Sequence, residues 1–283
     1  ALFANDVLEP LDGYVTPEFD IDDFEKPLLD AFKGPDGKYY GFPKDFSTLA
    51  LFYNKKHFEE AGIAEPPKTW EELIEVSKKL TKDGQYGFGV APELARQMFM
   101  IKAYGGEVAD AGGKATFASP DALKGLQLVI DQHLIDKTSA QPSEVGSGWG
   151  GEMFGQGKVS MVLEGNWAIP YLDNTFPDLD YGTAEVPTVN GKKGTMAFTV
   201  AYVMNKNSKH KEEAWKLIEF LTGKEGMKIW TSKGFALPTR KSVAADLGYD
   251  KDEFRSALVA GASYATSWQI GTTGPTIMTN FNN

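Results

Sequence analysis

Phe154-Gly-Gln-Gly-Lys-Val-Ser-Met-Val-Leu-Glu-Gly-Asn-Trp167 combines, in one short run of this 283-residue chain, a helix end, an apolar strand and an aromatic residue presented by glycine. Gly157, followed by a lysine, predicts the end of a helix, because glycine tolerates the left-handed conformation that closes a helix and a cation suits the negative end of its dipole. Val159–Leu163 is apolar and predicts a strand whose two faces are both covered by helices. Gly165 breaks that strand. We therefore expect Trp167 to emerge just after its carboxyl end, where ligands bind in open α/β sheets.

Strand-length apolar segments alternate with helical patterns through most of the sequence, which predicts an α/β fold. The other predicted strands are Leu49–Tyr53, Tyr86–Val90 and Phe198–Met204. Helices are predicted after the capping residues Thr69 and Ser119, and a third from about Lys211 to Leu221. In the helix that follows Ser119 we expect an inward apolar face, formed by Leu123, Leu126, Ile130 and Leu134.

Composition limits the classes of partner. The formal net charge of -10, from 29 basic and 39 acidic residues, gives no basic surface for nucleic acid or an anionic membrane. The chain has no cysteine, which excludes disulfides and thiolate metal sites within it. No apolar run approaches the roughly 20 residues that a membrane-spanning helix needs. Since the sequence begins with Ala1, we expect a processed or trimmed product.

Catalytic and cofactor motifs are missing from the sequence. His57, His133 and His210 lie far apart and not in a metal-binding or triad-like spacing, and neither a phosphate loop nor a dinucleotide fingerprint is present. We therefore expect no catalytic residue, no metal and no cofactor. A glycoside hydrolase that uses Asp45 or Glu93 as its acid stays open as an alternative, because sequence cannot show the separation of two carboxylates.

The tryptophans are more informative. Trp70, Trp215 and Trp230 lie within or after apolar helical patterns and are expected to be packing residues. Trp149, Trp167 and Trp268 instead stand beside glycines or polar residues at the ends of elements. We interpret these three as platforms for a sugar, since the C–H face of a pyranose ring packs on an indole without needing charge.

Sugar hydroxyls also need hydrogen-bond partners, which carboxylates, amides and hydroxyls supply. Polar residues of this kind near the predicted strand ends are Asp45, Ser47, Glu93, Gln97, Asn166 and Gln269.

Several blocks of sequence together resemble one known family, the extracellular solute-binding proteins of carbohydrate ABC transporters, which includes maltose-, maltodextrin- and trehalose-binding proteins. The order and spacing of the blocks carry the resemblance over nearly the whole chain. The blocks are Val7–Asp12, Gly41–Asn54, Pro67–Leu73, Tyr104–Gly106, Phe154–Trp167, Asn205–Lys209 with Ala214, and Leu237–Lys241.

The resemblance implies roles for particular residues. Trp167 is similar to the stacking tryptophan of the family, and Glu93 is similar in position to a ligand-binding acid of the maltose-type members. Two crossings between lobes are implied to contribute ligand contacts. The first contains Asp45 and Ser47, the second contains Phe198 and Thr199, and a late loop contains Trp268 and Gln269.

By the same resemblance, the fold class is α/β and periplasmic-binding-protein-like (type II), with two α/β lobes joined by crossing strands. We expect an amino-terminal lobe, incomplete in this chain, from residues 1–45 plus 203–250, and a carboxy-terminal lobe from residues 46–202 plus 251–283. Such proteins close on a sugar and deliver it to the permease subunits of an ABC transporter. The implied protein is a monomer located outside the cytoplasm, and it binds a disaccharide or short oligosaccharide. A polyamine-binding protein of the same fold, suited to the acidic charge, is the second alternative.

Overall fold

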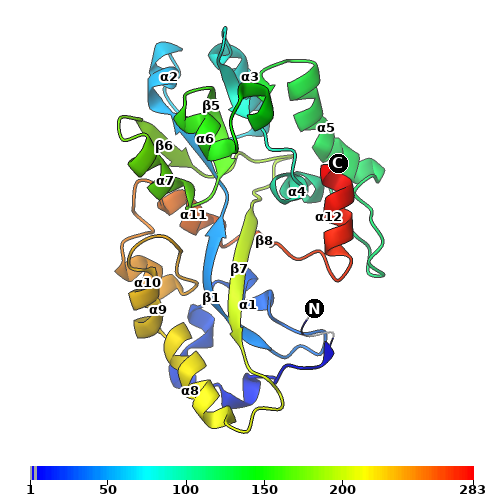
Figure 1. Ribbon diagram of the computed structural model, residues 1–283, viewed down its shortest axis with the longest axis vertical. Helices are drawn as coiled ribbons and strands as arrows, with labels where there is room; N and C mark the ends of the chain where they lie inside the picture. Colours follow the sequence, from blue (N-terminus) through cyan, green and yellow to red (C-terminus); the bar gives the residue numbers. More distant parts are fainter. Residues whose placement is uncertain (1, 3–4) are drawn as a thin grey trace. The chain divides into compact units, whose positions relative to one another are not determined.

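The computed structural model describes residue 2 and residues 5–283, which divide into two compact units (Figure 1). Unit 1 comprises Ala1–Thr48 and Ala197–Gln269, and unit 2 comprises Leu49–Met196 and Ile270–Asn283. The chain therefore passes from one unit to the other three times. These bounds differ from the expected lobes mainly at residues 251–269, which belong to unit 1. They lie there because β8 joins the unit 1 sheet and because the Thr48 hydroxyl donates to the Leu258 carbonyl at 2.7 Å.

Unit 2 is built on a five-stranded mixed sheet in the order β4-β3-β5-β2-β6. Strand β3 runs parallel to β4 and β5, whereas β2 runs antiparallel to β5 and β6. The strands are β2 (Ala50–Asn54), β3 (Tyr86–Gly89), β4 (Ser139–Ala140), β5 (Val159–Glu164) and β6 (Tyr181–Ala184). The helices are α2 (Lys55–Glu60), α3 (Trp70–Leu80), α4 (Leu94–Ala103), α5 (Pro120–Leu134), η5 (Pro142–Val145), α6 (Gly150–Gly155), α7 (Ala168–Thr175) and α12 (Gly274–Asn282).

The opening stretch folds as its sequence predicts. All six residues of β5 are buried, and the preceding helix α6 is closed by Gly157, which has φ +71°. The Lys158 N–H donates to the Met153 carbonyl at 3.0 Å, and the Gly157 N–H donates to the Phe154 carbonyl at 2.9 Å. This pair of bonds is a Schellman motif. It places the start of β5 directly after the helix.

The expected inward face of α5 is wrong. Leu123 and Ile130 are exposed, and Leu134 is 64% exposed. The face that packs inward contains Gly125, where a Cβ would lie only 2.3 Å from the Met100 carbonyl oxygen of α4. The absence of a side chain at this position lets the two helix backbones approach closely, and that approach decides which face is buried.

Unit 1 contains a three-stranded sheet in the order β1-β7-β8, in which β1 and β7 are antiparallel. Phe42 of β1 lies in the core against Phe19, with ring centroids 4.9 Å apart, and against Trp215. The strands are β1 (Gly41–Thr48), β7 (Met196–Val203) and β8 (Thr266–Ser267). The helices are η2 (Asp12–Tyr14), η3 (Pro17–Phe19), η4 (Ile21–Asp23), α1 (Lys26–Asp30), α8 (Lys211–Thr222), α9 (Lys224–Thr231), α10 (Lys241–Asp246) and α11 (Ser256–Gly261).

The block Leu237–Lys241 holds β1 in place. The N–H and carbonyl of Leu237 exchange two 3.0 Å hydrogen bonds with those of Phe46, and the Thr239 hydroxyl donates to the Pro43 carbonyl at 2.9 Å. Arg240 is 1% exposed. Its guanidinium donates to three backbone carbonyls, those of Phe19, Asp20 and Thr222. A buried cation is stable only when its donors have partners, and these three bonds supply them. They also tie the segment around Phe19 and Asp20 to the end of α8.

Within the described part of the chain, none of the helices combines the length and the apolar character that crossing a membrane requires.

Candidate functional site

The residues expected to bind a ligand are divided between the two units. Unit 2 holds Glu93, Gln97, Trp149, Asn166 and Trp167, and unit 1 holds Asp45, Ser47, Phe198, Thr199, Trp268 and Gln269.

Trp167 lies immediately after β5, as expected, and its indole is partly exposed. The indole Nε1–H donates to Glu164 Oε2 at 2.9 Å, which fixes the ring through its edge. A Cβ at Gly165 would lie 2.3 Å from the ring. Glycine at that position is therefore what allows the ring to fold back over the strand end.

Glu164, the last residue of β5, is fully buried with 0% exposure. Arg96 of α4 compensates its charge, because Nη2 donates to Glu164 Oε1 at 2.9 Å. Burial raises the pKa of the Glu164 carboxyl above its ordinary value, while the hydrogen bonds and charge of its partners oppose that rise. A Cβ at Gly150 would lie 2.4 Å from Glu164 Oε1, so glycine there leaves room for the carboxylate.

Arg96 also connects Glu164 to the surface. Its Nη1 donates to Glu93 Oε2 at 2.5 Å, and the Glu93 side chain is about half exposed. Trp167, Glu164, Arg96 and Glu93 thus form a continuous line of hydrogen bonds from an indole to a surface carboxylate, which we call the Trp167 network. Arg96 was missed by the sequence reasoning. The signal was its spacing three residues after Glu93, which places the two side chains together on a helix.

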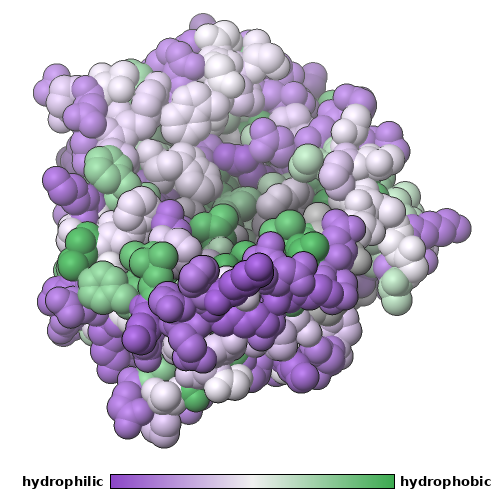
Figure 2. All heavy atoms as spheres, turned by 60° about the horizontal axis from the view of Figure 1, so that its bottom comes forward, coloured by the Kyte–Doolittle hydropathy of each residue, from purple (hydrophilic) through white to green (hydrophobic). Residues whose placement is uncertain are grey.

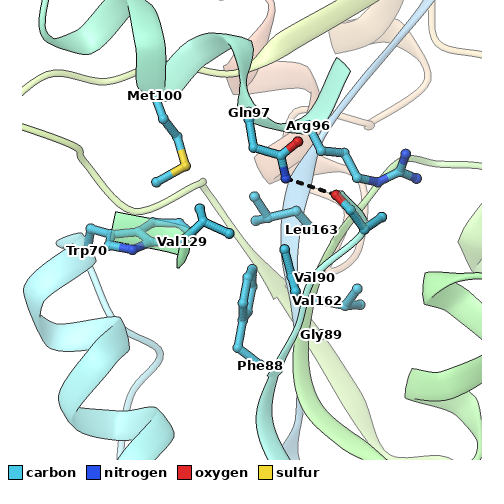
Figure 3. Close-up of a pocket in the computed structure, with 11 residues that line it drawn as sticks. Trp70, Phe88, Gly89, Val90, Arg96, Gln97, Met100, Val129, Val162 and Leu163 are labelled. Atoms are coloured by element: carbon cyan, nitrogen blue, oxygen red, sulfur yellow. Dashed lines mark hydrogen bonds between the residues drawn. The ribbon is translucent and has the colours of Figure 1, made fainter. Parts of the chain in front are cut away.

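Gln97 and Asn166 are both buried. The Gln97 amide nitrogen donates to the Ala91 carbonyl at 2.9 Å (Figure 3). In the same view, Arg96 points away from Gln97. Gln97 and Trp70 line a small cavity, in which the centre of a water molecule can move through about 10 Å³. This is room for one water molecule and not for a sugar ring. In this structure, Gln97 therefore lies beneath the surface.

Trp149 is the N-cap residue of α6 and is partly exposed. Its ring packs edge-on against Tyr171, with centroids 4.8 Å apart. A Cβ at Gly151 would lie 2.1 Å from the ring, so Trp149 folds back on its own unit while keeping part of its surface open.

In unit 1, three of the four expected residues of β1 and β7, namely Asp45, Ser47 and Phe198, lie on one face of the sheet. Asp45 is opposite Val200, and Ser47 is opposite Phe198. Cross-strand partners point to the same side, as do residues two apart on a strand. The Phe198 ring lies 6.5 Å from that of Trp268. We call Asp45, Ser47, Phe198, Val200 and Trp268 the unit 1 sheet face.

Thr199 and Gln269 have intramolecular partners. The Thr199 hydroxyl donates to the Asp45 carbonyl at 2.7 Å, and the Gln269 amide nitrogen donates to the Ala31 carbonyl at 2.6 Å. Thr199 follows Phe198 on β7, so its side chain points away from the sheet face. Gln269 itself is exposed.

The expectation that Trp230 is a packing residue is wrong, because its side chain is 54% exposed. The buried residues of α9 are Gly226, Met227 and Thr231, and Trp230 lies beside that stripe. Its Nε1–H donates to Asp45 Oδ2 at 2.6 Å. Figure 2 shows apolar groups set among strongly polar ones on the face that it displays.

No group of three or more histidine, aspartate and glutamate side chains that could hold a metal ion occurs among residue 2 and residues 5–283.

The fold and sequence are similar to those of binding proteins. The galactooligosaccharide-binding protein of Bacillus subtilis (strain 168) is 26% identical over 244 residues, which are 81% of this chain and 56% of that protein. The solved structure of the sugar-binding protein MalE from Xanthomonas citri matches with a TM-score of 0.87 at 23% identity, covering 99% of this chain and 73% of that chain. This likeness shows the fold, which is that of the two-lobe type II periplasmic binding proteins.

A putative binding protein of Brucella abortus (strain 2308) is 34% identical over 252 residues, 84% of this chain. The chain spans 59% of the length of that relative. The model of the family described as bacterial extracellular solute-binding protein matches residues 1–228. The chain belongs to this family.

Proposed function

We propose that this chain binds a disaccharide or short oligosaccharide, and that Trp167 is the platform on which a sugar ring stacks. The observation that carries the proposal is the Trp167 network. An indole that is partly exposed and fixed through its Nε1–H by a buried carboxylate presents a rigid ring. Rigid aromatic contacts lose little conformational entropy on binding.

The other end of the network suits sugar hydroxyls. Glu93 has a half-exposed carboxylate, and Arg96 orients it from behind. Charged acceptors form stronger hydrogen bonds with hydroxyl groups than neutral acceptors do. An aromatic ring and a few polar groups in fixed positions are what a binding site for a neutral polyhydroxylated ligand needs. The names of relatives support this class of ligand, since they include a galactooligosaccharide-binding protein and a maltotriose-binding protein of Pyrococcus abyssi.

The proposal extends to the mechanism of the family. Ligand binding closes the two units by a rotation at the three places where the chain passes between them, and closure is favoured only by the sugar's higher affinity for the closed state. The closed protein then delivers its sugar to the permease subunits of an ABC transporter. We propose a monomer located outside the cytoplasm, in line with the description of the family as extracellular.

Hydrolysis of the sugar is the weaker candidate. A glycoside hydrolase needs two carboxyl groups that both face the substrate. In unit 2, Glu93 and Glu164 share Arg96 as a partner, and Glu164 is fully buried. In unit 1, the Asp45 carboxylate accepts the Trp230 Nε1–H and lies 3.5 Å from Lys44 Nζ.

Isothermal titration calorimetry of the purified chain tests the proposal, with maltose, maltotriose, galactotriose, arabinotriose and spermidine as probes. We expect a saturable heat with at least one sugar and none with spermidine. Prolonged incubation with the sugar that binds, followed by chromatography, should recover it uncleaved. Binding of spermidine alone would contradict the sugar assignment, and shorter products would contradict the binding-only function.

A further inference from the structure

We infer that Trp230 is a second aromatic platform for the sugar, carried by unit 1 and positioned by Lys44 and Asp45. The inference rests on the proposed function and adds a ligand-binding residue to it.

A β-bulge creates the arrangement. The register of β1 against β7 shifts between Pro43 and Asp45, so Lys44 is the extra residue. In a regular strand, adjacent side chains point to opposite faces, but a bulge re-aims one of them. Lys44 and Asp45 therefore reach the same indole. Lys44 Nζ lies 3.9 Å from the Trp230 ring centroid, and Asp45 Oδ2 accepts its Nε1–H at 2.6 Å.

These contacts hold the ring without covering it. Lys44 occupies part of one face and Asp45 occupies the Nε1 edge, yet the Trp230 side chain remains 54% exposed. An exposed tryptophan costs free energy when left in water. One that is also fixed by a hydrogen bond and a cation–π contact presents a preorganised apolar surface.

Lys44 already occupies the cation position at the Trp230 ring. Its Nζ lies over the ring and is paired with the Asp45 carboxylate at 3.5 Å. The part of the indole that stays exposed is therefore apolar surface, which suits the C–H face of a neutral ring.

The position of Trp230 indicates a ligand of more than one ring. Asp45, its partner, and Ser47 lie two residues apart on β1, about 6.6 Å at the usual rise of a strand. Phe198, opposite Ser47, packs near Trp268. A single ring stacked on Trp230 leaves the Phe198 end of the unit 1 sheet face uncovered, whereas two joined rings can contact both ends.

Indole N–H resonances in a ¹H–¹⁵N spectrum test the inference on the unsubstituted chain. The chain has six tryptophans, and Trp230→Phe and Trp167→Phe each assign one resonance by its disappearance. The probe is the tightest-binding sugar of the calorimetric panel. We expect the Trp230 and Trp167 resonances to shift during the titration and the resonances of the buried Trp70 and Trp215 to stay in place.

Calorimetry of variants supplies the second readout. Trp230→Ala should weaken binding on the order of tenfold, the scale of one aromatic contact. The matched control is Phe220→Ala, which removes a half-exposed ring from α8 of the same unit and should leave affinity unchanged. A stationary Trp230 resonance, or full affinity in Trp230→Ala when Trp167→Ala binds weakly, overturns the inference alone. If no sugar binds the unsubstituted chain, the proposed function fails, and this inference fails with it.

Discussion

Substitution of Gly165 by alanine tests how Trp167 is presented. A Cβ at this position would lie 2.3 Å from the nearest atom of the Trp167 ring, whereas ordinary contacts begin at 3.4 Å. The ring must therefore retreat by at least 1.1 Å, the difference between these distances. Backbone strain plays no part in the expected effect, because Gly165 is not among the glycines with positive φ.

The expected cost follows from the bond that holds the ring. Trp167 Nε1 and Glu164 Oε2 are 2.9 Å apart, and a ring shift of this size breaks their hydrogen bond. A hydrogen bond to a charged group contributes about 1.5–3 kcal/mol. Partial relaxation of the ring recovers some of it, so we expect the free energy of unfolding to fall by about 1–3 kcal/mol. We also expect sugar affinity to fall at least as much as in Trp167→Phe.

Urea unfolding of the whole chain measures the change in stability, and calorimetry with the sugar measures the change in affinity. Gly194→Ala is the matched control, because its Cβ would meet Phe99 at an ordinary 3.4 Å and Gly194 likewise has no positive φ. Equal stability losses in both variants, or unchanged stability and affinity in Gly165→Ala, would show that Gly165 does not position the Trp167 ring.

Three further predictions concern packing and charge. Burial raises the pKa of Glu164. Its contribution to the free energy of unfolding is therefore present below the ordinary pKa of 4.5 and is lost as the pH rises through the raised pKa. Glu164→Gln should flatten this decline when urea midpoints are measured over a series of pH values. Gly125→Val should lower the free energy of unfolding by more than about 1 kcal/mol, because the new side chain overpacks against α4. Leu134→Ser, on the exposed face of α5, should change the urea midpoint little. Equal effects of the two substitutions would contradict the assignment of the buried face. Arg240→Met should lower the free energy of unfolding, measured by calorimetry, by about 3–5 kcal/mol, because three carbonyls and a nearby carboxylate lose their partner. A loss below about 1 kcal/mol would contradict the structural role of Arg240.

Local sequence signals predicted the elements around β5 well. The helix end at Gly157, the strand that follows and the exposed Trp167 depend on residues within one short stretch. The strands β2 and β3 were likewise predicted to within one residue at each end. Capping by Thr69 was also confirmed, with its hydroxyl accepting the Glu72 N–H at 3.1 Å.

Features that depend on distant partners were not predictable in the same way. Which face of α5 is buried depends on the approach of Gly125 to α4, and Leu123, Ile130 and Leu134 point to the exposed face instead. Trp230 follows an apolar pattern, yet its indole is held by Asp45, 185 residues away in the sequence. The bulge at Lys44 leaves no mark in the residue pattern. The division of the chain at residues 251–269 depends on the pairing of a two-residue strand, β8, which is too short to show periodicity.

The most direct test of Trp167 as the sugar platform is the affinity of Trp167→Ala for the sugar. We expect the variant to fold with a native circular dichroism spectrum and to bind about 5- to 150-fold more weakly than the unsubstituted chain, the range that corresponds to about 1–3 kcal/mol for a buried aromatic contact. A variant that binds the sugar as tightly as the unsubstituted chain would contradict the claim that this indole is the platform.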